Sequence, residues 1–223
     1  MMTRLPGISD RYRAMREINK VATTHSTRAE IFHAVSRVLK RVLNYDRAGL
    51  MLYQPEEDDL KIDAVDGTLP TSFFQIGARL SRKDTPHGCA FEGKRIIIRR
   101  NIEKECEFAI EEYTVREGLK SFCAVPLVIR GNCLGVMSLV SFREHQFAEK
   151  HAGFLQEISD EIVGPLASLM PFCVHHATSK LVCPRCIASS GGKKTTAKYR
   201  EQLSAWGKRG GRKRSEMSSL LRN

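Results

Sequence analysis

The residues best suited to chemistry lie near the end of the chain, where thiols and imidazoles recur at short spacing. The segment FCVHHATSKLVCPRC, residues 172–186, contains three cysteines and two histidines. Zinc prefers Cys and His ligands in a tetrahedral arrangement. We therefore expect a zinc or similar metal site within residues 170–188, with the ligands Cys173, His175, Cys183 and Cys186. His176 is the alternative imidazole, and the sequence does not choose between the two.

Three alternative roles for this segment stay open. The Cys-Pro-Arg-Cys turn is similar to a zinc knuckle, although Ile187 stands where many knuckles have Gly. The same two thiols could form a redox dithiol, but no thioredoxin-like strand and helix surround them. The ligands could also bind metal only in a dimer, or their spacing could be incidental.

A second candidate site is the basic arm, residues 189–223. From Met170 onward the chain has 12 Lys or Arg and two acids, whereas residues 1–169 have 24 and 23. Lys and Arg that neutralise phosphates give salt-dependent affinity for DNA or RNA, and Trp206 could stack on a base. The expected nucleic-acid contacts are Lys193, Lys194, Lys208, Arg209, Arg212, Lys213 and Arg214. Few aliphatic residues are present, so we expect the arm to be disordered alone. A solvated tail and an acidic protein partner are the alternatives.

The remaining thiols and acids give weaker signals. Cys123 and Cys133 lie in strongly apolar segments, where Cys usually acts as a small hydrophobe. Cys89 lies near His87 and Lys94, which leaves a redox-sensing or reductase thiol as an alternative. The acidic run of residues 56–59 and the pair Glu111-Glu112 are expected to be solvated surface. The sequence contains neither a Gly-rich phosphate loop nor a Gly-x-Ser-x-Gly elbow.

The elements that must position these residues follow from hydrophobic periodicity. Apolar residues at spacings of three and four predict helices over about residues 8–21 and 31–42, and Thr27 with Glu30 forms a capping-box pattern before the second. Alternation predicts a hairpin of residues 48–53 and 60–64. Further strands are expected at residues 76–80, 95–99, 121–129 and 133–141, and further helices from 84 to 93, around 111–117 and over 147–169. Hairpin-joined strands with helices predict an α+β fold with an antiparallel sheet.

Several segments together resemble the GAF domain family. These are GLKSFCAVPLVIRGNCLGVMSLVS and QFAEKHAGFLQEISDEIVGPLA, which resemble the family's C-terminal half, and INKVATTHSTRAEIFHAVSRVLKRVLNYDRAGLMLY and DTPHGCAFEGKRIIIRR earlier in the chain. The resemblance covers about residues 9–169. It implies a sheet of about six strands, with helices on one face and a ligand pocket on the other. The family's cyclic-nucleotide signature, Asn-Lys-x-x-Phe-Asp-Glu, does not occur here.

The expected function follows from this resemblance and from the arm. Family members are small-molecule sensors and dimerisation modules, so we expect a homodimeric regulatory protein, not an enzyme, that senses an unknown small molecule. A thiol-dependent reductase or redox sensor and an adaptor without a ligand are the alternatives. The first residues lack the apolar block of a secretory signal, and no apolar run approaches the roughly 20 residues that span a bilayer. We therefore expect a cytoplasmic protein without a membrane partner.

Overall fold

The described part of the chain forms an α+β domain around one antiparallel sheet. The structure, a computed structural model, describes residues 7–55, 57–67, 74–170, 172–173 and 178–179. Six strands hydrogen-bond in the order β3-β2-β1-β6-β5-β4, and every neighbouring pair is antiparallel. The strands are β1 (Arg47–Gln54), β2 (Asp59–Gly67), β3 (Arg79–Ser81), β4 (Ile97–Arg99), β5 (Ser121–Ile129) and β6 (Asn132–Ser141). The predicted fold class is confirmed.

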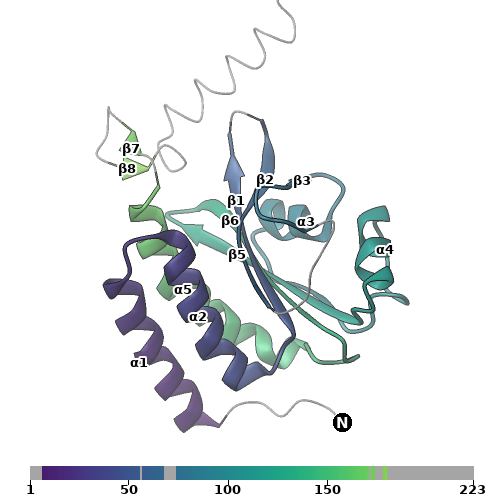
Figure 1. Cartoon of the computed structure of the whole chain (residues 1–223), viewed down its shortest axis with the longest axis horizontal. Coiled ribbons are helices and arrows are strands. Elements are labelled where there is room, and N and C mark those ends of the chain that lie inside the picture. Colours follow the sequence, from purple (N-terminus) through teal and green to yellow (C-terminus); the bar gives the residue numbers. More distant parts are fainter. Residues whose placement is uncertain (1–6, 56, 68–73, 171, 174–177, 180–223) are drawn as a thin grey trace, which may run out of the picture. The chain divides into compact units, whose positions relative to one another are not determined.

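Three helices cover one face of the sheet: α1 (Ile8–Thr24), α2 (Arg28–Leu43) and α5 (Ala152–Ser168) (Figure 1). The predicted capping box at the start of α2 is present, with the Thr27 hydroxyl accepting from the Glu30 N–H and the Glu30 carboxylate accepting from the Thr27 N–H. Apolar residues of these helices pack on inward-facing residues of β1, β5 and β6 in a continuous core. The alternation along the strands therefore places every second side chain against this helical layer.

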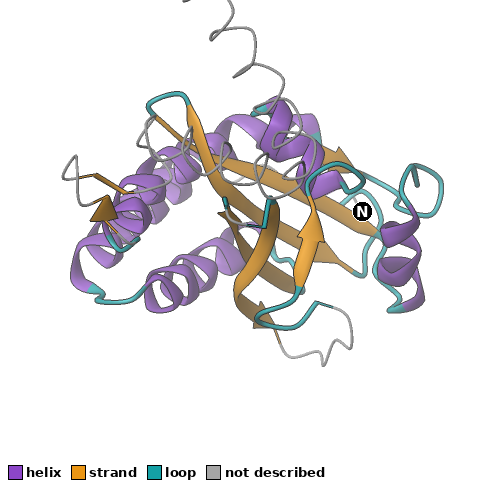
Figure 2. Cartoon of the chain, turned by 90° about the horizontal axis from the view of Figure 1, so that it is seen from above, coloured by secondary structure: helices purple, strands orange, loops and turns teal. Residues whose placement is uncertain are grey.

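Two shorter helices lie over the opposite face: α3 (Pro86–Gly93) and α4 (Ala109–Arg116). Figure 2 shows the strands as one layer with helices on both sides. A second apolar cluster joins α3 to this face through Ala90, Phe91 and Phe122. The opposite face is thus partly covered, and the space left under these helices is where a ligand pocket would form.

The hairpin between β5 and β6 turns through two residues with left-handed backbones. Arg130 has φ 49° and Gly131 has φ 77°. Such a turn matches the right-handed twist of the flanking strands, which makes it a favoured two-residue connection. It fixes the register that pairs Ile129 with Asn132 and Ser121 with Ser141.

Two predicted boundaries differ from the observed ones. β3 begins at Arg79 because Gly77 turns the chain with φ 91° and donates its N–H to the Ile62 carbonyl. The last helix is preceded by a 3-10 turn, Glu149–His151, in which the His151 Nδ1 accepts from the Ala148 N–H. The α-helix therefore begins at Ala152 and not near residue 147.

The acidic segments are not simply solvated, which corrects the sequence interpretation. Glu57 and Asp59 form salt bridges with Arg79 at 3.0 and 3.2 Å. Glu111 is only 4% exposed and binds Arg99 at 3.1 Å. Its carboxylate also accepts from two backbone N–H groups ahead of α4. These carboxylates hold the edge strands and α4 in place.

Candidate functional site

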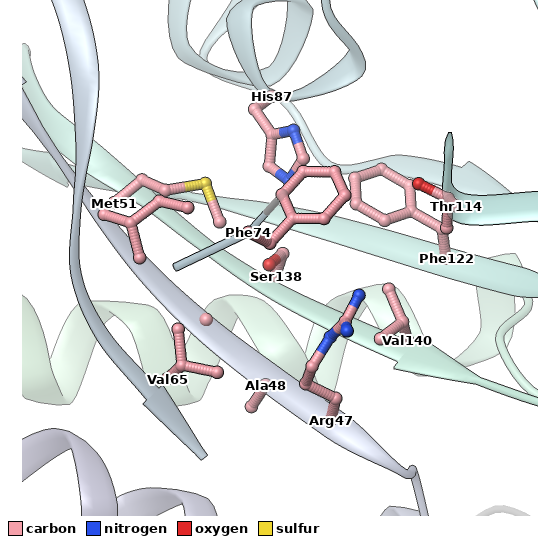
Figure 3. Close-up of a pocket in the computed structure, with 12 residues that line it drawn as sticks. Arg47, Ala48, Met51, Val65, Phe74, His87, Thr114, Phe122, Ser138 and Val140 are labelled. Atoms are coloured by element: carbon pink, nitrogen blue, oxygen red, sulfur yellow. The ribbon is translucent and has the colours of Figure 1, made fainter. Parts of the chain in front are cut away.

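A small pocket opens on the sheet face opposite α1, α2 and α5, beneath α3 and α4 (Figure 3). Its walls are mostly apolar side chains, with four buried polar ones among them. The lining residues come from both central strands and both short helices: Arg47, Ala48, Gly49, Met51, Ile62, Val65, Phe74, His87, Thr114, Phe122, Ser138 and Val140. An apolar cavity with a few convergent polar groups is the usual form of a small-molecule site.

Arg47, the first residue of β1, places a buried cation in the pocket wall. It is 5% exposed, and its Nη2 donates to Glu117 Oε2 at 2.8 Å. Its guanidinium carbon also lies 5.5 Å from the centre of the Phe74 ring. A buried charge is stable only when it is paired, so Glu117 and the aromatic ring offset the cost of desolvating this arginine. The guanidinium has five N–H donors, of which Glu117 takes one.

His87 enters the pocket from the first turn of α3. Thr85 caps this helix by accepting the Gly88 N–H at 2.9 Å, and Pro86 begins it. The imidazole of His87 is 6% exposed and packs edge-on against Phe122, with 5.0 Å between ring centres. Burial lowers the pKa of His87 to about 4, so the ring is neutral at neutral pH. Its Nδ1 has no hydrogen-bond partner within the described part of the chain.

The floor of the pocket is shaped by a glycine beside a serine. A Cβ at Gly49 would lie 3.1 Å from Ser138 Oγ and 3.1 Å from Met51 Cε, so a larger residue there would fill the floor. The space open to the centre of a water-sized sphere is about 30 Å³. A water needs roughly 10–15 Å³ of such space, so the pocket as it stands holds one or two waters.

The four cysteines of the described sheet and loops differ in environment. Cys123 is fully buried against the helical layer, and burial raises the pKa of its thiol far above the ordinary value. Burial also raises the pKa of Cys133, to about 11. Both are thus packing residues, as the sequence indicated, because a nucleophilic thiol needs a depressed pKa. Cys106 is exposed and Cys89 is half-buried, and none of the four is in a disulfide.

Most of the site residues predicted from the sequence lie outside the described part of the chain. Cys173 is in the short strand β7 (Phe172–Cys173), whose backbone pairs with β8 (Thr178–Ser179). His175, Cys183, Cys186 and the seven basic residues of the arm are not described. Among the residues that are described, no three His, Cys, Asp or Glu side chains come together as a metal site would require.

The sequence interpretation missed the pocket residues themselves. Arg47 had a usable signal, since it is a charged residue at the start of an otherwise apolar strand. His87 also had one, because it follows a helix cap and faces an apolar segment across the fold. Sequence alone gives no means of pairing them, since 40 positions separate Arg47 from His87 and Ser138 lies farther still.

These features define a class of small α+β domains that enclose a ligand pocket between a sheet and short covering helices. The chain belongs to the GAF domain family, whose model matches residues 27–164. No curated protein matches the sequence. No helix in the described part of the chain is long and apolar enough to cross a membrane.

Solved structures share the fold at low identity. One is the GAF domain of a phosphoenolpyruvate-protein phosphotransferase from Coxiella burnetii, with a TM-score of 0.63 and 18% identity over 71% of this chain and 94% of that one. The GAF domain of an Acinetobacter phosphoenolpyruvate-protein phosphotransferase has a TM-score of 0.59 and 18% identity, covering 70% and 92%. The free methionine-R-sulfoxide reductase of Neisseria meningitidis, solved with its substrate, has a TM-score of 0.61 and 17% identity, covering 74% and 95%.

Proposed function

We propose that this protein is a regulatory sensor. Its GAF domain binds a small molecule in the pocket beneath α3 and α4, and its basic C-terminal arm contacts nucleic acid. The observation that carries the proposal is the pocket wall, where the buried Arg47 and the buried, unpartnered Nδ1 of His87 line one cavity within the described part of the chain. Buried polar groups without partners are costly, so such groups are retained where a ligand or ordered water satisfies them.

Native mass spectrometry of the purified full chain tests the sensing role. We expect a bound small molecule, and its addition to ligand-free protein should raise the melting temperature because only the folded state binds it. Replacing Gly49 with Ala would fill the pocket floor and abolish this shift. Replacing the exposed Gly153, which has open space around it, with Ala is the matched control. Full stabilisation of the Gly49→Ala variant would place the ligand elsewhere.

The proposed nucleic-acid contact rests on the charge density of residues 189–223. Nothing in the arm resembles a groove-reading motif, so contacts would be to phosphates and weakly dependent on sequence. Affinity for duplex DNA should fall steeply with salt, with a slope of about 0.9 per phosphate contact, as expected for counterion release. Replacing Arg212, Lys213 and Arg214 with Ala should reduce both affinity and slope. Unchanged binding after removal of residues 189–223 would exclude the arm as the contact.

A homodimer through α1 and α5 is part of the proposal. Ile8 and Tyr12 lie one turn apart on α1 and are 88% and 66% exposed, which is unusual for large apolar side chains and supports a contact there. Light scattering at tens of micromolar should give twice the chain mass, and Tyr12→Lys should lower it toward the monomer. Tyr113, 45% exposed on α4, provides the control position, since Tyr113→Lys should leave the mass unchanged.

A zinc site at Cys173, His175, Cys183 and Cys186 is the remaining proposal, and it rests on ligand type. One equivalent of zinc should accompany the reduced protein from a zinc-replete preparation. Replacing both Cys183 and Cys186 with Ser should remove it, whereas replacing the exposed Cys106 with Ser should not. A metal-free parent protein under these conditions would exclude the site.

Two alternative functions each have one supporting observation. The small free volume of the pocket favours an adaptor whose fold no longer binds a ligand. The likeness in fold to free methionine-R-sulfoxide reductases favours a thiol enzyme. Alkylation across a pH range separates them, because a reductase thiol reacts well below the ordinary Cys pKa and an adaptor has no such thiol. Cys89 and Cys106 are the thiols to follow, since the other two described thiols are buried.

A further inference from the structure

The polar groups of the pocket indicate which chemical class of ligand it takes. Arg47 is the only cation among the lining residues, and it is nearly fully buried. Figure 3 shows its side chain extending from β1 toward Ser138 and Phe74, so the guanidinium faces the cavity and not the solvent. A planar guanidinium matches a carboxylate through two parallel hydrogen bonds. Its present partner, Glu117, accepts from Nη2.

Glu117 is itself a replaceable partner. It is the residue that ends α4, and its side chain is 21% exposed against 6% for that of Arg47. Negative charge at a helix C-terminus is unfavourable, so α4 does not itself retain this carboxylate. A ligand carboxylate that took its place at Arg47 would leave one cation and one anion in the pocket. Glu117 could then turn to water at little cost.

The other walls restrict the rest of the ligand. Ser138, Thr114 and His87 offer buried hydrogen-bonding groups, and the other lining side chains are apolar. A second negative charge would find no second cation among the lining residues, which disfavours phosphates and dicarboxylates. The free volume of about 30 Å³ admits only a short chain.

We propose that the pocket binds a short-chain monocarboxylate of about two to four carbon atoms, whose carboxylate replaces Glu117 at Arg47. The inference rests on the proposed sensing function and extends it to the ligand class. It also gives the signal a first step. Binding releases the C-terminal end of α4 from Arg47, so occupancy of the pocket is reported at residues 109–117.

Titration of the full chain with acetate, propionate and butyrate tests the inference, with the corresponding primary amides as neutral analogues. Binding is followed by NMR shifts or by melting temperature. We expect the carboxylates to bind and the amides to fail. Hydrogen exchange in α4 should rise on carboxylate binding, because the contact between Glu117 and Arg47 is lost.

Paired variants give effects of opposite sign. Glu117→Gln removes the competing charge, so carboxylate affinity should rise by about tenfold or more. Arg47→Gln should abolish binding. Glu112→Gln and Arg116→Gln, on the exposed side of the same helix, are the matched controls and should change nothing. Misfolding cannot produce tighter binding, so Glu117→Gln remains informative even if Arg47→Gln does not fold.

The outcomes separate this inference from the sensing function. Failure of all three carboxylates on both the parent and Glu117→Gln would overturn the ligand class, as would amides binding equally well. If another metabolite then shifts the signals of the pocket residues, the sensing function stands without this ligand. If no small molecule does so, both fail.

Discussion

At the scale of single residues, the pocket contrasts two ways of burying a basic side chain. Arg47 keeps its charge because Glu117 and the face of Phe74 accompany it. His87 packs against two aromatic rings, Phe74 and Phe122, and remains neutral because burial is the cause that lowers its pKa. The same cavity therefore contains one permanent cation and one group that acid can charge.

The neutral state of His87 makes the stability of the domain depend on pH. The folded pKa, about 4, lies below the unfolded value of about 6.5, so the unfolded chain takes up the proton first as the pH falls. The stabilisation is therefore complete above pH 6.5 and is lost between about pH 6.5 and 4, by at most about 3 kcal/mol. His87→Leu should flatten this acid loss in denaturant titrations.

A second histidine contributes with the same sign. Burial lowers the pKa of His151 as well, so His87→Leu should remove only part of the acid slope. The control is His145, which is exposed in a left-handed backbone that Asn tolerates, and His145→Asn should keep the parent slope. An unchanged slope in His87→Leu would mean that His87 is not buried as described.

At the scale of elements, the placement of α3 depends on one buried hydroxyl. Thr85 Oγ1 accepts from the Gly88 N–H at 2.9 Å and donates to the Ser81 carbonyl at 2.6 Å. It thus joins the first turn of α3 to the end of β3. Gly88 allows the close approach, since a Cβ there would lie 2.1 Å from the Arg82 carbonyl oxygen.

Removing this hydroxyl should loosen the wall that holds His87. Thr85→Ala should lower the free energy of unfolding by about 1–2 kcal/mol, the usual cost of losing an N-cap. Thr85→Ser keeps both hydrogen bonds and should remain close to the parent in chemical denaturation. Equal losses in the two variants would show that packing of the Thr85 methyl group, and not capping, stabilises this turn.

At the scale of the whole molecule, the folded domain and the charged end of the chain are separable in composition. The six-stranded sheet is closed on its helical face by α5, which contributes Phe154, Leu155, Ile158 and Ile162 to the core. Long-range packing is therefore complete by the end of that helix. The excess positive charge begins after it.

We therefore expect residues 1–170 to fold without the rest of the chain. Circular dichroism should show a cooperative thermal transition, because the shortened chain retains every helix and strand of the domain. A chain ending at residue 150 is the control, and it should lose cooperativity because α5 is missing. A gradual, non-cooperative transition for residues 1–170 would show that the domain boundary is wrong.

The sequence by itself determined the order and kind of the elements. Periodic apolar residues identified both N-terminal helices, and Thr27 with Glu30 fixed where the second begins. Local rules were sufficient there, since caps, tight turns and strand alternation depend on residues a few positions apart. For the same reason, the two-residue turn at Arg130-Gly131 and the buried role of Cys123 could be predicted.

Only the tertiary structure decided where the ligand pocket lies and which charges are buried. Arg47, Glu117 and His87 belong to β1, the end of α4 and α3, and no local pattern relates them. Glu111 was expected in water for the same reason, since its partner Arg99 is on another element. A buried charge is tolerated only beside its partner, and the partner is brought there by the sheet order, which local sequence does not encode.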